Sequence, residues 1–436
     1  MPLRSNIQRL TSLVVAVAFG LFISLIPIGN RSWVPAALDK LREIVGIGND
    51  FSTSNFKGFD SQRYFFKNIY QSNESGVFQL AQVGGRTIYA VERFTGAVGK
   101  LDLTNFRYSR VNNVFSDLSL TKITSPDKLP LVMDLASDNE YLYISIVVQN
   151  QLNLQENLRV FKYKLGKQKS HWIKVFESEY IADRANSQMW GGRIVLDPDN
   201  IYVSVGEQRF DRSGFPKNEQ QYSNQEIDRT YFGKIARITK LDGKVSTFSS
   251  GHRNAQGLFI DSEGNFWESE HGPNGGDEVN ILIESQNYGW PHVTLGKPYP
   301  QRYPSGKNEI NQARNPRIGV DTSLDRFGFK SGVHVSYKQP IMSWAPGVGA
   351  GNLVRVDSTS NLVDWRGNLL IAMMGEETFH RLVIDKKFTV YHDERINIGA
   401  RVRDFILTKS GILVISTDDG RLVVFKTFDS KLPQRL

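Results

Sequence analysis

A strand-rich unit that recurs about every 60 residues is the feature that most constrains how this chain can fold. Each copy has an apolar stretch, an aspartate, a tight turn and a second strand of alternating apolar residues. The clearest copies lie at residues 132–145, 194–204, 258–269 and 404–416. In the first three copies the aspartates are Asp134, Asp197 and Asp261, spaced by 63 and 64 residues. Weaker copies lie at residues 78–91 and 354–372. Short strands at a fixed spacing, with few helical windows, are typical of a β-propeller.

The length of the repeating region sets the number of blades. Residues 76–430 leave room for about six units, so we expect an all-β, six-bladed β-propeller. A pair of β-sandwiches is the alternative, but sandwiches do not repeat a loop, strand and turn at constant spacing. Loops on one face of a propeller converge on its axis, so residues far apart in sequence can meet in one site. Residues 296–332 are the least strand-like segment, and they suit either a cover over one rim or a surface insertion.

The N-terminal region predicts export. Residues 10–28 form an apolar run without charge behind Arg4 and Arg9. As a helix this run reaches about 29 Å, close to the thickness of a bilayer core. Basic residues ahead of it place the N-terminus in the cytoplasm. We therefore expect residues 1–30 to be a signal anchor, with the propeller facing the periplasm or cell exterior. A cleaved signal peptide, which would give a secreted protein, is the rival interpretation. Residues 31–75 are expected to be a lead-in segment.

Composition narrows the classes of partner. The net charge of +8 is mild for 436 residues and favours an anionic ligand or membrane surface over a neutral one. Lys and Arg form no clustered run, so nucleic-acid binding is not expected. The chain has no cysteine, which excludes disulfides, thiolate zinc sites and cysteine nucleophiles.

Residues 251–290 carry the pattern most informative about chemistry. They contain a polar turn with Arg253 and Asn254, one short strand, a second polar turn with His271 and Asp277, and a corner ending in Trp290. Two such loops separated by one strand can place an Arg, an Asn, a His and an acid around one pocket. The segment resembles the glucose/sorbosone dehydrogenase family, the soluble aldose dehydrogenases that use pyrroloquinoline quinone (PQQ). The resemblance spans roughly residues 191–425 and is most specific in its first 100 residues.

The resemblance implies a six-bladed propeller that oxidises a hydroxyl of an aldose or related polyol and passes the electrons to PQQ. Arg253 and Asn254 match the family's cofactor-contacting pair, and an Arg beside a quinone oxygen would stabilise the charge that develops there. An inter-blade ion pair is the alternative role for Arg253. Gly272 and Pro273 match a pair whose backbone carbonyls hold calcium, an ion that accepts such oxygen ligands.

Five further positions match the family's cofactor site. His271 corresponds to a ligand contact, and Asp277 to the acidic end of the calcium loop, although a solvated turn would also place an acid there. Trp344 corresponds to an aromatic near the cofactor, with a core position as the alternative. Arg401 and Arg403 match a pair that binds cofactor carboxylates. Alternate residues at a strand end point the same way, so both guanidiniums can face one anion.

Two positions depart from the family pattern. Met189 stands four residues before Arg193, where the family has its catalytic histidine, and a thioether cannot accept a proton at neutral pH. Loss of a general base typically lowers the rate by about 10²–10⁴. Gly375 stands where the family has a lysine that reaches the cofactor. His271 is the best alternative base, and His380 is a second candidate.

Two interpretations of function follow. The retained arginines and loops favour a membrane-anchored quinoprotein dehydrogenase with an altered mechanism or substrate. The losses at Met189 and Gly375 favour a binding module, in which a propeller of the same origin holds a sugar, a quinone or a protein partner without turnover.

Overall fold

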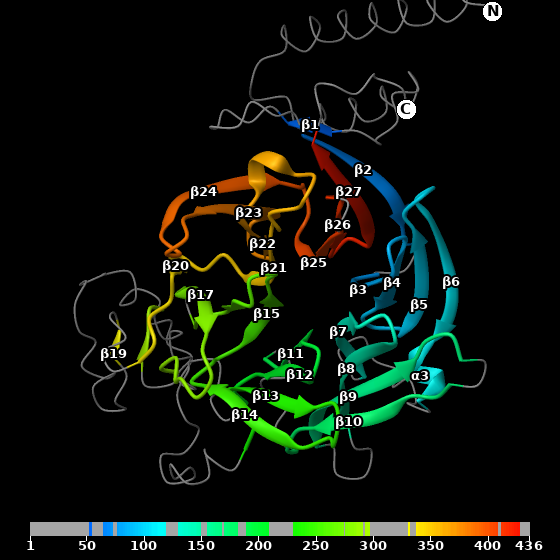
Figure 1. The fold of residues 1–436 in the computed structure, drawn as a ribbon, viewed down its shortest axis with the longest axis horizontal. Helices are drawn as coiled ribbons and strands as arrows, with labels where there is room; N and C mark the ends of the chain where they lie inside the picture. The colour runs from blue at the N-terminus through cyan, green and yellow to red at the C-terminus, as the bar shows by residue number, and fades with distance from the viewer. Residues whose placement is uncertain are drawn as a thin grey trace, which may run out of the picture.

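The computed structural model is an all-β propeller whose six blades surround a central axis, which confirms the fold predicted from the repeats (Figure 1). The structure describes residues 52–54, 64–72, 76–118, 130–149, 155–167, 170–181, 189–208, 230–273, 275–290, 293–296, 330–331, 337–408 and 411–427. The predicted anchor at residues 10–28 and nearly all of the segment at residues 296–332 lie outside these ranges. Within them, no helix has the length and apolar character that crossing a membrane requires.

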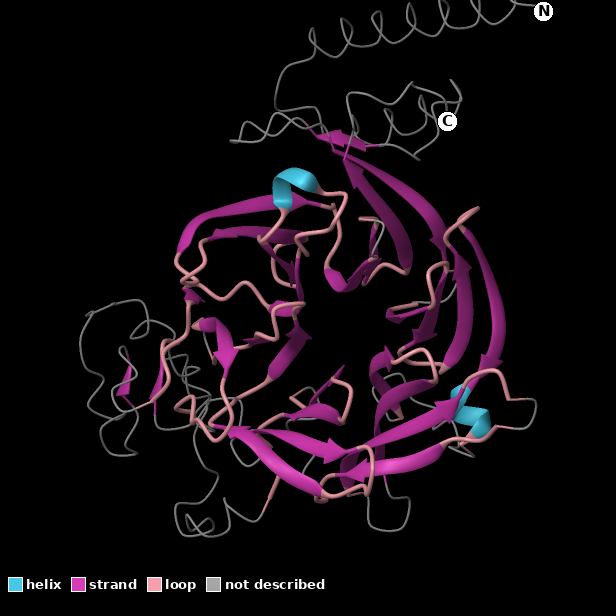
Figure 2. Ribbon diagram, viewed as in Figure 1, coloured by secondary structure: helices cyan, strands magenta, loops and turns pink. Residues whose placement is uncertain are grey.

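The blades are made of strands joined by loops (Figure 2). Five of them are four-stranded antiparallel sheets whose strands follow the chain from the axis outward (Figure 1). Blade 1 contains β3 (Phe78–Val83), β4 (Thr87–Glu92), β5 (Ala97–Asp102) and β6 (Arg107–Asn113). Blade 2 contains β7 (Leu131–Ser137), β8 (Tyr141–Gln149), β9 (Glu156–Lys164) and β10 (Ile173–Glu177). Blade 3 contains β11 (Gly191–Leu196), β12 (Asn200–Val205), β13 (Lys234–Thr239) and β14 (Val245–Ser250). Blade 4 contains β15 (Ala255–Ile260), β16 (Phe266–Glu270), β17 (Asp277–Leu282) and β20 (Met342–Trp344). Blade 5 contains β21 (Ala350–Arg355), β22 (Leu369–Met373), β23 (Thr378–Ile384) and β24 (Val390–Asn397).

Blade 6 joins the two ends of the described chain. Its inner strands are β25 (Val402–Leu407), β26 (Leu413–Thr417) and β27 (Arg421–Thr427), and its outer strands are β2 (Tyr64–Gln71) and β1 (Ser52–Ser54). Both β1 and β2 come from the range that the sequence set apart as a lead-in. Because β2 pairs antiparallel with β27, the lead-in segment closes the ring.

Little regular structure lies outside the blades. A two-stranded parallel sheet is formed by β18 (Val293–Thr294) and β19 (Lys330–Ser331). The described residues contain two short helices, α3 (Val114–Asp117) after blade 1 and a 3₁₀ turn (Val363–Trp365) between β21 and β22.

A turn aspartate follows the inner strand in blades 2, 3 and 4. Asp138, Asp197 and Asp261 each accept backbone N–H bonds from their own turn, which are the bonds that hold an Asx-type turn. Each also accepts a bond from an aromatic side chain of the next strand, namely Tyr143, Tyr202 and Trp267. The equivalent of Asp197 and Asp261 in blade 2 is therefore Asp138. Asp134, which the repeat pattern aligns with them, lies in β7 itself and accepts a hydrogen bond from Arg193 on the axis instead.

Among the described residues, the core consists of six apolar clusters, and each cluster fills the interface between two neighbouring blades. Between blades 5 and 6, for example, Trp365 stacks on Phe425 with ring centroids 5.2 Å apart, and both side chains are fully buried. Alternate residues of each strand face opposite neighbours, so one strand contributes to two interfaces. This face-to-face packing holds the inner strands β3, β7, β11, β15, β21 and β25 around the axis (Figure 1).

Candidate functional site

The residues that precede the inner strands β11, β15 and β25 form one end of the propeller axis, which we call the axial entrance. Met189 lies just before β11, Arg253 just before β15, and Arg401 just before β25. Contacts bring the segments of β11 and β15 together. The Asn254 side-chain oxygen accepts from the Gly191 backbone N–H at 3.1 Å and from Gln256 Nε2 at 2.9 Å. These contacts place the segment of Met189 beside the segment of Arg253.

Arg253 is buried and held rigidly at this entrance. Its backbone N–H donates to Glu270, and its Nη1 donates to the carbonyl oxygens of His271 and Gly272 at 3.0 and 2.6 Å. Its Nη2 lies 3.7 Å from the Met189 sulfur, and the guanidinium lies 5.4 Å from the centre of the Trp290 ring. Arg253 thus touches Met189, the residue that the resemblance aligns with the family's histidine.

His271 presents an unused ring nitrogen at the same place. Its Nε2 has no hydrogen-bond partner among the described residues. Burial lowers the pKa of His271, Arg253 and Arg403 lower it further, and Asp277 opposes them. The imidazole is therefore neutral at neutral pH, which is the state that can accept a proton.

Arg401 and Arg403 converge on one carboxylate. Arg403 makes a bidentate pair with Asp418, through Nε at 2.8 Å and Nη2 at 2.9 Å. The Nε of Arg401 donates to the carbonyl of Met374 and lies 3.5 Å from Asp418. Asp418 lies in the turn between β26 and β27, within the same blade, so the pair remains at the entrance with one neutralising acid.

Arg93 is a cation of this entrance that the sequence analysis missed. It follows β4, and its Nη2 lies 3.4 Å from the Met133 sulfur. Burial lowers the pKa of Arg93 to about 9, and the nearby guanidiniums of Arg403 and Arg193 lower it as well, with Asp418 opposing them. Arg93 lies in blade 1, outside the region of resemblance, so no motif marked it.

Hydrogen bonds to Asp277 stabilise the Gly272–Pro273 turn, for which the resemblance implies calcium binding. Asp277 accepts from the backbone N–H groups of Gly272, Val348 and Gly349 at 3.0, 2.9 and 2.6 Å. Both its oxygens are thus engaged, and the residue is buried rather than on a solvated turn. The Gly272 carbonyl accepts from Arg253, whose positive charge opposes a cation on the same oxygen. Pro273 is buried beside Gly272. This donor set fits calcium poorly.

Three other positions have a local structural explanation. Trp344 is buried in the cluster between blades 4 and 5, where its Nε1 donates to Asp393 at 3.0 Å. His380 has acids on both ring nitrogens, with Asp393 2.7 Å from Nδ1 and Glu376 3.2 Å from Nε2. A Cβ on Gly375 would lie 2.7 Å from the Val348 carbonyl oxygen, so a lysine there requires a backbone shift.

Arg193 closes the axis beneath the entrance. Its Nη1 reaches Asp134 at 2.9 Å, Asp404 at 3.0 Å and Gln79 at 3.2 Å. Its Nε and Nη2 donate to the carbonyls of Gln256 and Arg403. Burial raises the pKa of Asp134 to about 6, and that of Asp404 is also raised by burial, while Arg193 opposes both shifts. Five blades thus meet at one buried guanidinium, which we call the axial hub.

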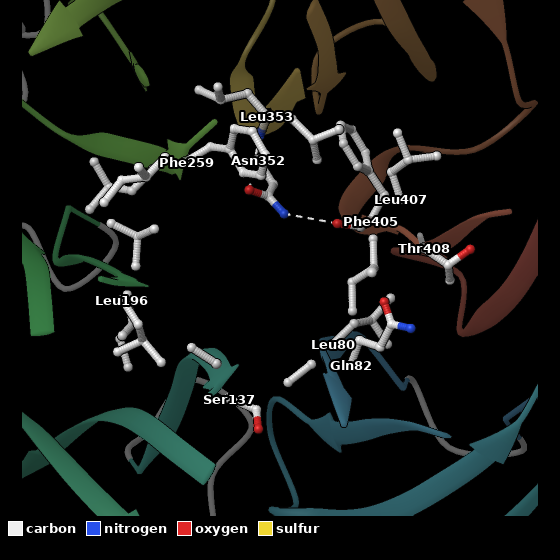
Figure 3. A pocket seen from close by; sticks show the side chains of 18 of the residues that line it. Leu80, Gln82, Ser137, Leu196, Phe259, Asn352, Leu353, Phe405, Leu407 and Thr408 are labelled. Atoms are coloured by element: carbon white, nitrogen blue, oxygen red, sulfur yellow. Dashed lines mark hydrogen bonds between the residues drawn. The ribbon is translucent and has the colours of Figure 1, made fainter. Parts of the chain in front are cut away.

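A cavity of about 620 Å³ lies on the other side of the axial hub. It is ringed by inner-strand side chains such as Leu80, Leu196, Phe259 and Leu407, and Asn352 bonds to the carbonyl of Phe405 in its wall (Figure 3). None of the entrance arginines and neither Met189 nor His271 lines this cavity. The entrance residues and the cavity therefore occupy different parts of the axis.

Comparison with known proteins supports the resemblance. Residues 131–424 match the family model described as glucose/sorbosone dehydrogenase. Quinoprotein glucose dehydrogenase B of Acinetobacter calcoaceticus is 23% identical over 414 residues, which cover 81% of this chain and 85% of that protein. Aldose sugar dehydrogenase YliI of Escherichia coli is 27% identical over 250 residues, and an uncharacterized protein of Synechocystis is 26% identical over 278 residues. These two matches cover 53% and 58% of this chain, and only 57% and 59% of the relatives.

Solved structures share the fold. The apo-form of the soluble aldose sugar dehydrogenase from Escherichia coli superposes with a TM-score of 0.62 at 20% identity, covering 83% of this chain and 99% of that one. The PQQ-bound aldose sugar dehydrogenase from Streptomyces coelicolor superposes with a TM-score of 0.56 at 17% identity, covering 84% and 98%.

Proposed function

Because the chain belongs to the glucose/sorbosone dehydrogenase family, we propose that it binds PQQ at the axial entrance and oxidises a hydroxyl of a sugar or related polyol. The observation that carries this proposal is the gathering of Arg93, Arg253, Arg401 and Arg403 at one end of the axis, beside a neutral histidine. Several guanidiniums that converge without an anion repel one another, and Asp418 neutralises only part of their charge. PQQ has three carboxylates, so its charge fits this donor set.

Each residue of the entrance then has a role. Arg403, Arg401 and Arg93 hold the anionic cofactor, and Arg253 stabilises negative charge on its quinone oxygen. Bound PQQ would supply a quinone that accepts the hydride of the sugar carbon. His271 is the described side chain best suited to take the hydroxyl proton, because its ring is neutral and Nε2 is open. Met189 occupies the family's base position without replacing its chemistry, so turnover is slow.

Met189 and Gly375 support a second candidate, a propeller that binds its ligand without turnover. These two residues stand where the family has a histidine and a lysine that its chemistry uses, while the anion-binding arginines remain. The two candidates differ only in whether bound cofactor is reduced by a sugar.

Reconstitution distinguishes the candidates. The full chain, purified in mild detergent, is mixed with PQQ in the presence of either calcium or a chelator. Cofactor absorbance measures binding, and dye reduction measures turnover on several aldoses. Binding with slow, sugar-dependent dye reduction supports the dehydrogenase. Binding without any reduction supports the binding module, and absence of PQQ binding at high concentration contradicts the proposal.

We expect Arg93→Gln to weaken PQQ binding by about tenfold or more, because a hydrogen bond to a charged group contributes roughly 1.5–3 kcal/mol. Fluorescence titration with PQQ measures the affinity. Arg110→Gln is the matched control, since Arg110 is exposed on the outer strand β6 of the same blade. Equal affinities for the wild type and Arg93→Gln would remove Arg93 from the cofactor site.

We also propose that residues 10–28 anchor the protein with its propeller outside the cytoplasm. The uncharged run behind Arg4 and Arg9 supports this topology. Protease treatment of intact cells should digest the propeller. Recovery of a protease-resistant cytoplasmic protein that keeps its N-terminus would contradict the topology.

A further inference from the structure

Three ionisable side chains are buried where the interface between blades 3 and 4 is otherwise apolar. Phe266, Glu268 and Glu270 alternate along β16 and therefore share one face of the sheet. Phe266 packs with Phe248 and Tyr288 in the apolar cluster of this interface. His252, from the turn before β15, stacks on the Tyr288 ring with centroids 4.8 Å apart. The face thus brings an imidazole and two carboxylates together in the interior.

The geometry of the three groups suits a metal ion. One ligand atom from each of His252, Glu268 and Glu270 lies within 4.8 Å of the others. Their exposed fractions are 1%, 0% and 5%. Within the described ranges, no Lys or Arg side chain forms an ion pair with either glutamate. Two buried carboxylates without a Lys or Arg partner are costly, because burial removes the water that would solvate their charge.

Each of the three residues also has an atom available for a ligand bond. Glu268 accepts from Asn280 through Oε2, while its Oε1 has no partner. Glu270 uses Oε2 for the backbone N–H of Arg253, while its Oε1 lies 3.7 Å from His252 Nδ1. That Nδ1 has no hydrogen-bond partner either. Nε2 of His252 lies 2.9 Å from Ser249 Oγ, and when it donates there, Nδ1 keeps a lone pair on the side of Glu270.

We propose that His252, Glu268 and Glu270 bind one divalent transition-metal ion, such as Zn²⁺ or Mn²⁺. An imidazole nitrogen with carboxylate oxygens suits these ions, whereas Ca²⁺ prefers oxygen ligands alone. The site is closed to solvent, so its role is structural. Glu270 also holds the backbone of Arg253 and Asn254, and the ion therefore fixes the loop that carries Arg253 into the entrance.

Metal content and stability test the site without PQQ. The full-length protein in detergent is treated with a chelator, dialysed against Zn²⁺ or Mn²⁺, and freed of excess ion. We expect about one retained ion per chain and a higher unfolding temperature. Glu268→Gln keeps an acceptor for Asn280 but loses a ligand charge, and affinity should fall by more than about 100-fold, since even outer partners of metal ligands cost about 10–100-fold. Glu376→Gln, which alters a carboxylate beside His380 in blade 5, should retain the ion.

A second measurement needs no variant. Mn²⁺ bound to the wild type should show electron spin-echo modulation from an imidazole nitrogen. The competing explanation is a proton on Glu268, whose pKa is raised by burial and by the neighbouring Glu270. In that case the wild type retains no ion, added metal leaves the unfolding temperature unchanged, and Glu268→Gln is at least as stable as the wild type. Any of these results would overturn the metal site and leave the proposed function untouched.

Discussion

Replacing Met189 with histidine is expected to raise sugar-dependent dye reduction by about 100-fold or more when PQQ is supplied, because it restores a general base. The Met189 sulfur lies 3.7 Å from Arg253, so an imidazole at this position would lie beside the guanidinium. The positive charge and the burial both disfavour the protonated ring, which keeps the new base ready to accept a proton. PQQ affinity should change little, since the substitution leaves every arginine in place. Steady-state kinetics and PQQ titration measure the two quantities.

Met189→Leu is the matched control, because it keeps an apolar side chain of similar size and adds no base. It should not increase turnover. If the wild type already turns over rapidly and Met189→His slows it, another residue is the base, and His271→Ala is the next variant to measure. If neither protein binds PQQ, the binding-module candidate gains support.

Arg193→Met should destabilise the fold by about 3–5 kcal/mol, since removing one partner of a buried ion pair leaves uncompensated charge. Asp134 and Asp404 would both lose their cation, and the carbonyls of Gln256 and Arg403 would lose their donor. Denaturant unfolding followed by circular dichroism measures the loss. Arg237→Met, which removes a partly exposed ion pair between β13 of the same blade and Glu284 after β17 of blade 4, should cost at most about 1 kcal/mol.

The loss of stability caused by Arg193→Met should depend on pH. Without the guanidinium, the pKa values of Asp134 and Asp404 in the folded protein rise further above the unfolded value of 3.8. A carboxyl group with a raised folded pKa favours the fold while it is protonated, and this contribution is lost as pH rises through that pKa. The difference in unfolding free energy between the variant and the wild type should therefore be smallest near pH 5 and largest near pH 8. A difference that is constant across this range would show that the pair does not act through charge.

The sequence carries enough pattern to predict the propeller, but not its internal alignment. Hydrophobic alternation and turn residues repeat because every blade packs one face of its strands against each neighbouring blade and joins those strands by tight turns. The aspartates of blade 2 show the limit of this reasoning. Asp134 and Asp138 both follow an apolar stretch, and only hydrogen bonding reveals that Asp138 holds the turn while Asp134 meets Arg193. Closure by β2 was also missed, since pairing between the two ends of a chain leaves no local signal.

The candidate site was predictable in part for a similar reason. Arg253, His271, Arg401 and Arg403 lie in segments with a family motif, and the structure brings all four to the axial entrance. Arg93 reaches the same entrance from a blade without such a motif. Trp344 and Asp277 lie in motif segments as well, yet local packing and backbone bonds account for both. Sequence marks which loops gather at an axis, whereas the partners of each side chain depend on all six blades.

The pairing of β2 with β27 sets an order for folding as the chain is made. Blades 1, 2, 3 and 5 each use four consecutive strands, and blade 4 uses β15, β16, β17 and β20, so each can form as soon as its own segment is available. The sixth must wait, because the Gln71 side chain donates to the carbonyl of Asp419, 348 positions further along. Contacts over such separations form late. Until then, one edge of β2 stays unpaired, and an open strand edge can pair with another chain. Incompletely synthesised chains at high local concentration can therefore exchange strands. Slow expression should yield a larger fraction of monomeric protein than rapid expression.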